Sequence, residues 1–295
     1  MSIATHILEV SRFYIVYVFS FIFVAGIIGS ILNILTFLSQ KQFRNCPAVF
    51  YIVVESLISI IVLLIGLLPR ALSEIFHDEK SISSIILCKL RIPATQWCTL
   101  LILSIINFAA FDQYLSTNCD PRRRQLSTVK LAKRLIFTSA IIWLLYNIPF
   151  IIYYDSQVSF GCLLRDSILR QYYSYFHLLV LYGILPLLFT TTVSLLAYRN
   201  VRRIHRLQMT NTRRKLDRQM TAMIFARVAF MIICLIPFLI QRFYTANVPS
   251  DPKNILRSAI EYLVGAINVS ISYVNIAVRK LNLFDRVIIA CCQVF

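Results

Sequence analysis

Long apolar runs separated by short polar stretches dominate the pattern along this chain. Seven runs reach or approach the ~20 residues that a helix needs to cross a ~30 Å hydrocarbon core. They cover residues 13–38, 48–68, 93–111, 135–154, 176–198, 220–240 and 255–278. Inside a bilayer the backbone has no water to bond with, so such runs form helices. The pattern predicts an all-α integral membrane protein with seven transmembrane helices, the last of them the weakest because Glu261 and Asn268 interrupt it.

The composition supports the same reading. The chain is 58% hydrophobic and 15% charged, whereas a soluble domain carries about 25% charge. Its mean hydropathy is +0.72. The first apolar run exceeds the ~7–15-residue core of a cleaved signal peptide, and no small-x-small cleavage site follows it. We therefore expect a retained first helix behind a short tail of residues 1–12.

The basic residues set the expected orientation. Loops after the first, third, fifth and seventh runs hold roughly twice as many Lys and Arg as the loops on the other side. This bias predicts a multi-pass plasma-membrane protein with an extracellular amino terminus and a cytoplasmic carboxyl end. It also accounts for the net charge of +17 as a rim facing anionic lipid and cytoplasmic partners, without nucleic acid.

Two pairs of cysteines have an expected chemistry under this topology. Cys88 and Cys162 are the two that fall in extracellular loops, an oxidising compartment, so we predict a disulfide between them. Cys291 and Cys292 lie near the end of a basic, amphipathic carboxyl-terminal segment. Palmitoylation and plain thiols both remain open for this second pair.

Nothing in the sequence divides the chain or points to an enzyme. There is no linker or low-complexity tract, so we expect residues 1–295 to form a single domain of antiparallel neighbouring helices. The four histidines lack metal-ligand spacing, and no GxSxG, HExxH or phosphate-binding loop occurs. We predict no catalytic site, no metal and no cofactor. The low number of glycines, 6, argues against the Gly-interrupted helices of many transporters.

A series of markers runs through the predicted helices in a characteristic order. The series comprises Gly29 and Asn33 of a GxxxN pattern, Cys88 at the start and Asp112-Gln113-Tyr114 at the end of helix three, Trp143, Pro186, and Cys234-Leu235-Ile236-Pro237. This arrangement resembles the class A (rhodopsin-like) G-protein-coupled receptors over nearly the whole chain. The resemblance implies a seven-helix bundle, and residues 280–292 suggest a short cytoplasmic helix eight.

The chain departs from the family pattern at the positions that control activation. Glu55 stands in place of the helix-two aspartate, Gln113 in place of the DRY arginine and Leu235 in place of the CWxP tryptophan. Residues 268–273 are a degraded NPxxY pattern in which Ser270 takes the proline position. By resemblance, the activation residues are Asn33, Glu55, Asp112, Gln113, Tyr114, Pro237 and Tyr273.

Two of these positions have specific expectations. For Glu55, the resemblance implies a sodium-and-water pocket shared with Asn33. The alternative is a protonated Glu55 hydrogen-bonded to Asn33 or a neighbouring serine, and we favour this second reading. Gln113 is neutral and cannot form the family's ion pair with Asp112. We therefore expect Asp112 to interact with basic residues of the second cytoplasmic loop or with water.

The expected ligand site lies between helices three, five, six and seven. Glu261 lies about nine residues into helix seven, or ~14 Å, counted from a predicted start at Pro252. Either it anchors a cationic ligand group, or it pairs with Arg257 one turn earlier. Helix three offers no acid at this depth, which argues against a usual amine receptor, and helix seven has no lysine there for a retinal Schiff base. The candidates are Thr95, Gln96, Thr99, Gln241, Tyr244, Glu261 and Tyr262.

The sequence thus predicts a cell-surface receptor that binds a small cationic or peptide ligand from outside and signals through a heterotrimeric G protein. The nearest subtype is an invertebrate neuropeptide-type receptor. Its G-protein surface would include Arg202, Arg203 and Arg218. One alternative is a receptor-like protein that binds a ligand or a partner receptor without activating G proteins. A seven-span transporter is the less favoured alternative, and homo- or hetero-dimers remain open.

Overall fold

The computed structural model describes residues 3–39, 47–76, 85–118, 120–157, 161–164, 166–207, 229, 233–241, 243–245, 248 and 254–281. Within these residues, six helices are long and apolar enough to cross a membrane. They match six of the seven predicted spans. The remaining span, 220–240, lies largely outside the described residues, although residues 233–241 are helical. The proposed helix eight at 280–292 also lies outside them, apart from the last residues of the preceding helix.

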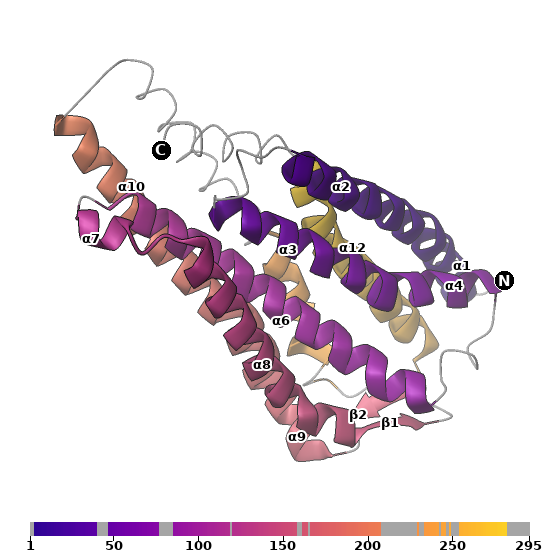
Figure 1. The fold of residues 1–295 in the computed structure, drawn as a ribbon. Coiled ribbons are helices and arrows are strands. Elements are labelled where there is room, and N and C mark those ends of the chain that lie inside the picture. The colour runs from indigo at the N-terminus through magenta and orange to yellow at the C-terminus, as the bar shows by residue number, and fades with distance from the viewer. Residues whose placement is uncertain are drawn as a thin grey trace.

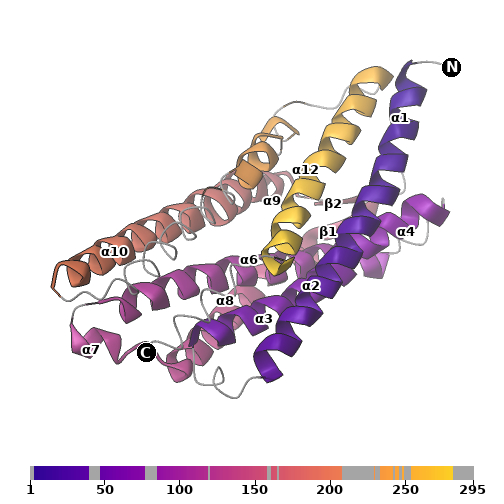
Figure 2. The same ribbon diagram turned by 90° about the horizontal axis from the view of Figure 1, so that it is seen from above.

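The first span is longer than the sequence predicts. It runs continuously through α1 (Ile3–Tyr14), the π-helical segment η1 (Ile15–Phe19) and α2 (Ser20–Ser39). The expectation of a short tail before Phe13 is therefore wrong. Polar residues lower the hydropathy of this stretch, but Ser11 is fully buried and α1 packs along α12 (Ile255–Leu281), as Figure 2 shows.

Prolines coincide with irregular turns in two of the spans. The second span consists of α3 (Pro47–Val62), η3 (Leu63–Leu67) and α4 (Leu68–Phe76). The fifth consists of α9 (Ser167–Tyr172), η4 (Tyr173–Ile184) and α10 (Leu185–Leu207). The π-helical segments η3 and η4 end just before Pro69 and Pro186. A proline has no N–H to donate to the preceding turn, so the turn there rearranges.

Polar side chains cap the amino-terminal ends of the two helices that follow the third span. The third span is α6 (Ile85–Ser116) and the fourth is α8 (Val129–Tyr153). Between them, Asp120 accepts from the Arg122 N–H to begin α7 (Pro121–Arg124), and Thr128 accepts from the Leu131 N–H to begin α8. Such N-caps satisfy amides that have no partner within the helix.

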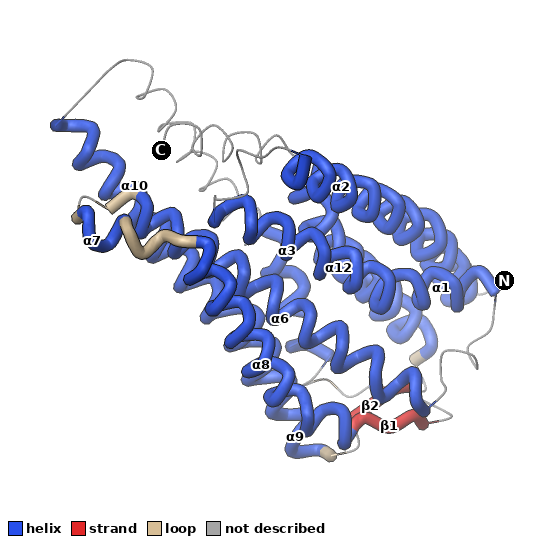
Figure 3. The backbone as a smooth tube through the Cα atoms, viewed as in Figure 1, coloured by secondary structure: helices blue, strands red, loops and turns tan. Residues whose placement is uncertain are grey.

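A small hairpin follows α8 and is an addition to the predicted all-α fold. Strands β1 (Tyr154–Gln157) and β2 (Gly161–Leu164), red in Figure 3, pair antiparallel. Tyr154 lies opposite Leu164. The hairpin packs beside α6. It occupies the loop between the fourth and fifth spans.

The bundle has α6 near its centre. This helix packs against α3, α8 and α10, while α12 packs against α1 and α2 (Figure 1). One core cluster joins α3, α6 and α8, and a second joins η1, η3, α4 and α12; Tyr273 packs against both. Large apolar side chains such as Phe21, 74% exposed, cover the outside. An apolar exterior around helices is what a lipid solvent requires, so the all-α membrane bundle is confirmed.

Candidate functional site

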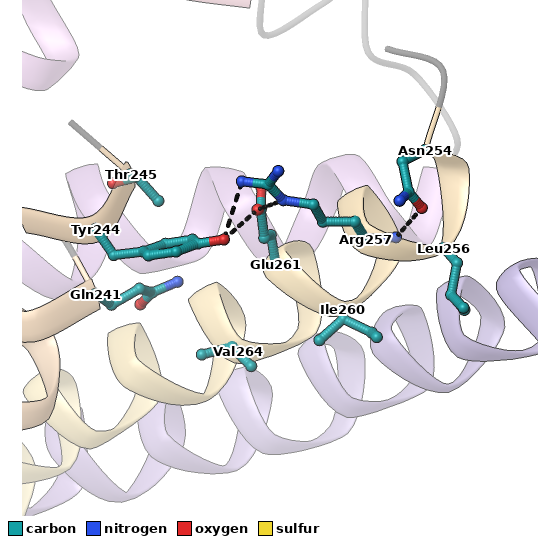
Figure 4. Close-up of a pocket in the computed structure, with 9 residues that line it drawn as sticks. All are labelled: Gln241, Tyr244, Thr245, Asn254, Leu256, Arg257, Ile260, Glu261 and Val264. Carbon is teal, nitrogen blue, oxygen red and sulfur yellow. Dashed lines mark hydrogen bonds and ion pairs between the residues drawn. The ribbon is translucent and has the colours of Figure 1, made fainter. Parts of the chain in front are cut away.

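A pocket of about 360 Å³ lies between residues 241–245 and the first turns of α12 (Figure 4). Its polar lining comes from Gln241, Tyr244, Thr245, Asn254, Arg257 and Glu261. Leu256, Ile260 and Val264, spaced four residues apart, supply an apolar wall and are exposed. The buried face of α12 carries Ala259 and Ala266 instead. The pocket therefore opens on the exposed flank of α12.

Three side chains form a closed hydrogen-bonded triad in this pocket. Arg257 Nε lies 2.8 Å from Glu261 Oε1, one helical turn away. Arg257 Nη2 donates to the Tyr244 hydroxyl at 3.0 Å, and that hydroxyl donates to Glu261 Oε1 at 3.1 Å. The triad thus contains the Arg257–Glu261 pair that one reading of the sequence predicted. A role for Glu261 in holding a ligand stays a prediction.

Gln241 links the pocket to the middle of α12. Its Oε1 accepts a hydrogen bond from Asn268 Nδ2 at 2.8 Å. Gly265 allows this approach, because a Cβ there would lie 3.0 Å from Gln241 Nε2. The sequence analysis noted Asn268 as an interruption of an apolar run and as the first residue of the degraded NPxxY pattern. In the structure it ties α12 to the helical residues 233–241.

Tyr262 lies apart from the pocket, although it follows Glu261 directly. Its hydroxyl donates to Glu74 Oε1 on α4, and Glu74 Oε2 lies 3.3 Å from Arg12 Nε on α1. Consecutive helical residues point about 100° apart, so the two neighbours reach different helices. Sequence reasoning missed Glu74 and Arg12. Glu74 lies beyond the predicted run 48–68, and only the continuation of the second span through α4 places this acid inside a transmembrane helix.

The helix-three candidates also lie elsewhere. The Thr95 and Thr99 hydroxyls donate to the carbonyls of Arg91 and Thr95, one turn earlier. Gln96 is buried and donates from Nε2 to the Tyr154 hydroxyl at 3.2 Å. Its Oε1 has no partner in the described part of the chain. The structure thus brings Gln241, Tyr244 and Glu261 together and separates the other four candidates from them.

His177 is a buried polar residue that the sequence analysis did not single out. Its ring is fully buried and stacks on Tyr173, with 4.8 Å between ring centres, and on Tyr146 at 5.7 Å. The Tyr146 hydroxyl lies 3.1 Å from His177 Nδ1. The aromatic residues Tyr146, Phe150 and Tyr173 were the available sequence signal for this cluster. A single histidine on an apolar helix has no spacing pattern that links it to them. The cluster fastens η4 to α8.

The acid in the second span is buried, as its apolar surroundings predict. Glu55 is 5% exposed, and Asn33 of α2 is also buried. Asn33 Nδ2 has no hydrogen-bond partner among the described residues. Asn33 Nδ2 therefore donates no hydrogen bond to Glu55. The sodium-and-water reading and a hydrogen bond from a protonated Glu55 to Asn33 Oδ1 or to a serine all stay predictions.

Asp112 has a partner from the second loop, but of another kind than the sequence predicts. Ser127 Oγ donates to Asp112 Oδ1 at 2.7 Å, where a basic side chain or water was expected. Arg122 and Arg124 are exposed on α7. Arg123 instead reaches Tyr114, with Nη1 3.4 Å from its hydroxyl. The Gln113 carbonyl accepts from Thr117 at the end of α6.

The structure describes some of the remaining predicted positions and not others. Pro237 is half-buried within helical residues 233–241, and Tyr273 packs into both cores. Arg202 and Arg203 lie in the last turns of α10. The remaining predicted positions, Arg218, Cys291 and Cys292, lie outside the described residues. Cys88 and Cys162 are placed by backbone only, in the first turn of α6 and in β2.

Comparison with known proteins gives the family. The family of 7 transmembrane receptors (rhodopsin family) matches residues 29–277, which span most of the chain and all of the markers quoted above. No curated relative matches the sequence significantly. The match agrees with the apolar spans and with the central position of α6. The chain therefore belongs to the rhodopsin family of seven-transmembrane receptors.

Proposed function

We propose that this receptor binds a small cationic or peptide ligand from outside the cell and signals through a heterotrimeric G protein. The observation that carries the ligand class is the triad of Arg257, Glu261 and Tyr244 in the pocket beside α12. Ionisable side chains within a membrane span are expensive and commonly functional. Here they line a pocket large enough for a side chain or a small ligand.

The pairing within the triad favours a peptide over a simple amine. A lone ammonium group must displace Arg257 before it can reach Glu261 Oε1, since the two side chains are already 2.8 Å apart. A peptide carries both kinds of group that the pair can bind. Its basic groups can bind Glu261, and its carbonyl or carboxylate oxygens can accept from Arg257. Asn254 precedes α12 and accepts from the N–H of Arg257 in its first turn, near the end of the bundle. A peptide can therefore approach along this rim.

The opposite end of the bundle is the proposed G-protein surface. The basic bias of the loops supports a cytoplasmic position for α7 and for the end of α10. Asp112 and Gln113 end α6 there, and α10 carries Arg202 and Arg203 in its last turns. Arg218 belongs to the same loop region by sequence. This orientation also supports a plasma-membrane receptor with an extracellular amino terminus.

The experiment is a ligand screen on cells that express the chain at a measured surface density. Amidated peptides and biogenic amines would be tested by calcium and cyclic AMP responses, with untransfected cells as a control. We expect a peptide response that Glu261→Gln weakens. Ligand binding without either response would favour the receptor-like protein that works without G proteins. Absence of both binding and response across the peptide and amine sets would contradict the proposed ligand class.

A further inference from the structure

Ser127 holds the loop between α7 and α8 onto the end of α6. Its hydroxyl is 2.7 Å from Asp112 Oδ1, and Asp112 is only 7% exposed. A hydrogen bond to a buried carboxylate is charge-assisted and stronger than a neutral one. The contact therefore anchors the loop to the helix that ends at the proposed signalling surface.

The backbone bonds of this loop run back to α7 and not to α6. Residues 125–128 lie between the two helices, and the N–H groups of Gln125, Leu126 and Ser127 donate to the carbonyls of Pro121, Arg123 and Arg124 at 3.1–3.2 Å. Leu126 is 55% exposed, so it contributes little burial. Exposed segments with few buried contacts open locally at low cost. A modifying enzyme can therefore reach Ser127 without unfolding the bundle.

The residues before Ser127 have the charge pattern that basophilic protein kinases require. Arg122, Arg123 and Arg124 stand five, four and three residues before the serine, and all three are exposed. Arginine forks bind carboxylates of an acidic enzyme groove in two-point contacts. Thr128, the next hydroxyl, is already used as the N-cap of α8. The pattern thus selects Ser127 over its neighbour.

We propose that Ser127 is a phosphorylation site whose modification releases this loop from α6. The Ser127 hydroxyl attacks the γ-phosphorus of ATP, the bond to ADP breaks, and the hydroxyl proton passes to a base of the kinase. The inference rests on the proposed cytoplasmic position of the loop, where ATP and kinases are present.

The release follows from the loss of a donor and the gain of charge. Once esterified, Ser127 Oγ has no hydrogen to donate to Asp112, and the phosphate places about −1.5 to −2 charge beside a buried carboxylate. Arg124 and Lys130, each three residues from Ser127 in sequence, are both exposed. They would draw the phosphate outward. The surface beside Gln113 and Tyr114 would then change its shape and charge.

The test uses the full-length receptor in lipid nanodiscs. A basophilic serine kinase that requires arginine three residues before its target is added with ATP, and phosphopeptides are read by mass spectrometry. We expect phosphate on Ser127, none there in Ser127→Ala, and an unchanged yield at Ser127 in Thr128→Asn, which keeps an N-cap. Arg124→Gln should slow the modification roughly tenfold, because a charged contact with the kinase is truncated.

Hydrogen exchange of the peptide that contains Ser127 then measures the release. Phosphorylation should speed its exchange about tenfold, as expected from loss of one charge-assisted bond. In Asp112→Asn the increase on phosphorylation should be clearly smaller, because the like-charge repulsion is gone. Equal exchange before and after phosphorylation, or no phosphate on Ser127, would overturn the proposal.

A cell experiment separates this inference from the proposed function. Kinase and ATP added outside intact cells should leave Ser127 unmodified, and the same reagents should modify it after permeabilisation. Labelling from outside would overturn both the orientation and the switch. If the receptor is phosphorylated on Ser127 inside cells but responds to none of the screened ligands, the phosphorylation proposal stands and the proposed ligand class is contradicted.

Discussion

The hydroxyl of Tyr273 on α12 occupies the space beside Gly66 of η3 where any other residue would place its Cβ. Thr95 of α6 closes the same space, with its Cγ2 3.3 Å from that position. Tyr273 also packs against both core clusters. The absence of a side chain at Gly66 therefore lets three spans meet at one tyrosine.

Gly66→Ala should destabilise the receptor. The added methyl group overlaps the Tyr273 hydroxyl, and overpacking of this kind costs about 1–3 kcal/mol. The measurement is the melting temperature of purified receptor in detergent. Tyr273→Phe removes the clashing oxygen and should restore much of the loss in the double variant. Gly265→Ala is the control, because it meets only the flexible end of Gln241. Equal melting temperatures for Gly66→Ala and the parent would contradict the close contact.

Glu261→Gln should weaken agonist binding by more than tenfold. Truncating one side of a desolvated charge pair costs roughly 2–5 kcal/mol. Surface expression should hardly change, because solvent screens partly exposed pairs such as Arg257–Glu261, which contribute little to stability. Radioligand or fluorescent-ligand binding measures the first quantity, and antibody labelling of intact cells the second.

Tyr262→Phe is the matched control for that experiment, since Tyr262 binds Glu74 on another side of α12. It should leave agonist affinity unchanged. If Glu261→Gln instead abolishes surface expression while affinity in the surviving protein holds, the pair with Arg257 is structural and the ligand role is wrong.

Gln113→Arg should raise the maximal agonist response at equal surface expression. The resemblance gives an arginine here two roles, locking the resting state through Asp112 and contacting the G protein. Asp112 is already bound by Ser127, and the charged contact with the partner is roughly twice as strong as a neutral one. Improved coupling should therefore dominate, with little change in ligand affinity. Dose–response curves for calcium or cyclic AMP measure it; an unchanged or lower maximum would show that the glutamine suits this receptor's own coupling.

Cys88 and Cys162 should form a disulfide in the receptor isolated from cells. Cys162 lies in β2, opposite Ser156, and the hairpin packs beside α6, whose first turn contains Cys88. The bond would fix the hairpin to the third span. Digestion without reduction, followed by mass spectrometry, should recover the two peptides as one cross-linked species. Recovery of both cysteines as unmodified thiols would disprove it.

Much of the fold could be predicted from the sequence, because lipid leaves the backbone few choices. A run such as 135–154 is too apolar for water and long enough to cross a bilayer, so it forms a helix wherever it packs. Side-chain pairs within one helix could also be predicted from the sequence. Arg257 and Glu261 are four residues apart, and the helical period alone brings them together.

Contacts between helices could not be read from the chain. The sequence analysis placed Glu261 and Tyr262 in one ligand site. In the structure, Glu261 is hydrogen-bonded to Tyr244 and Tyr262 to Glu74. It gives Asp112 many basic neighbours, yet a serine hydroxyl reaches the carboxylate. Apolar periodicity marks which residues avoid water, but not how each helix is rotated or how far it is displaced along its neighbours. Packing of large side chains against small ones, as at Tyr273 and Gly66, sets both, and so only the tertiary structure decides which polar groups meet.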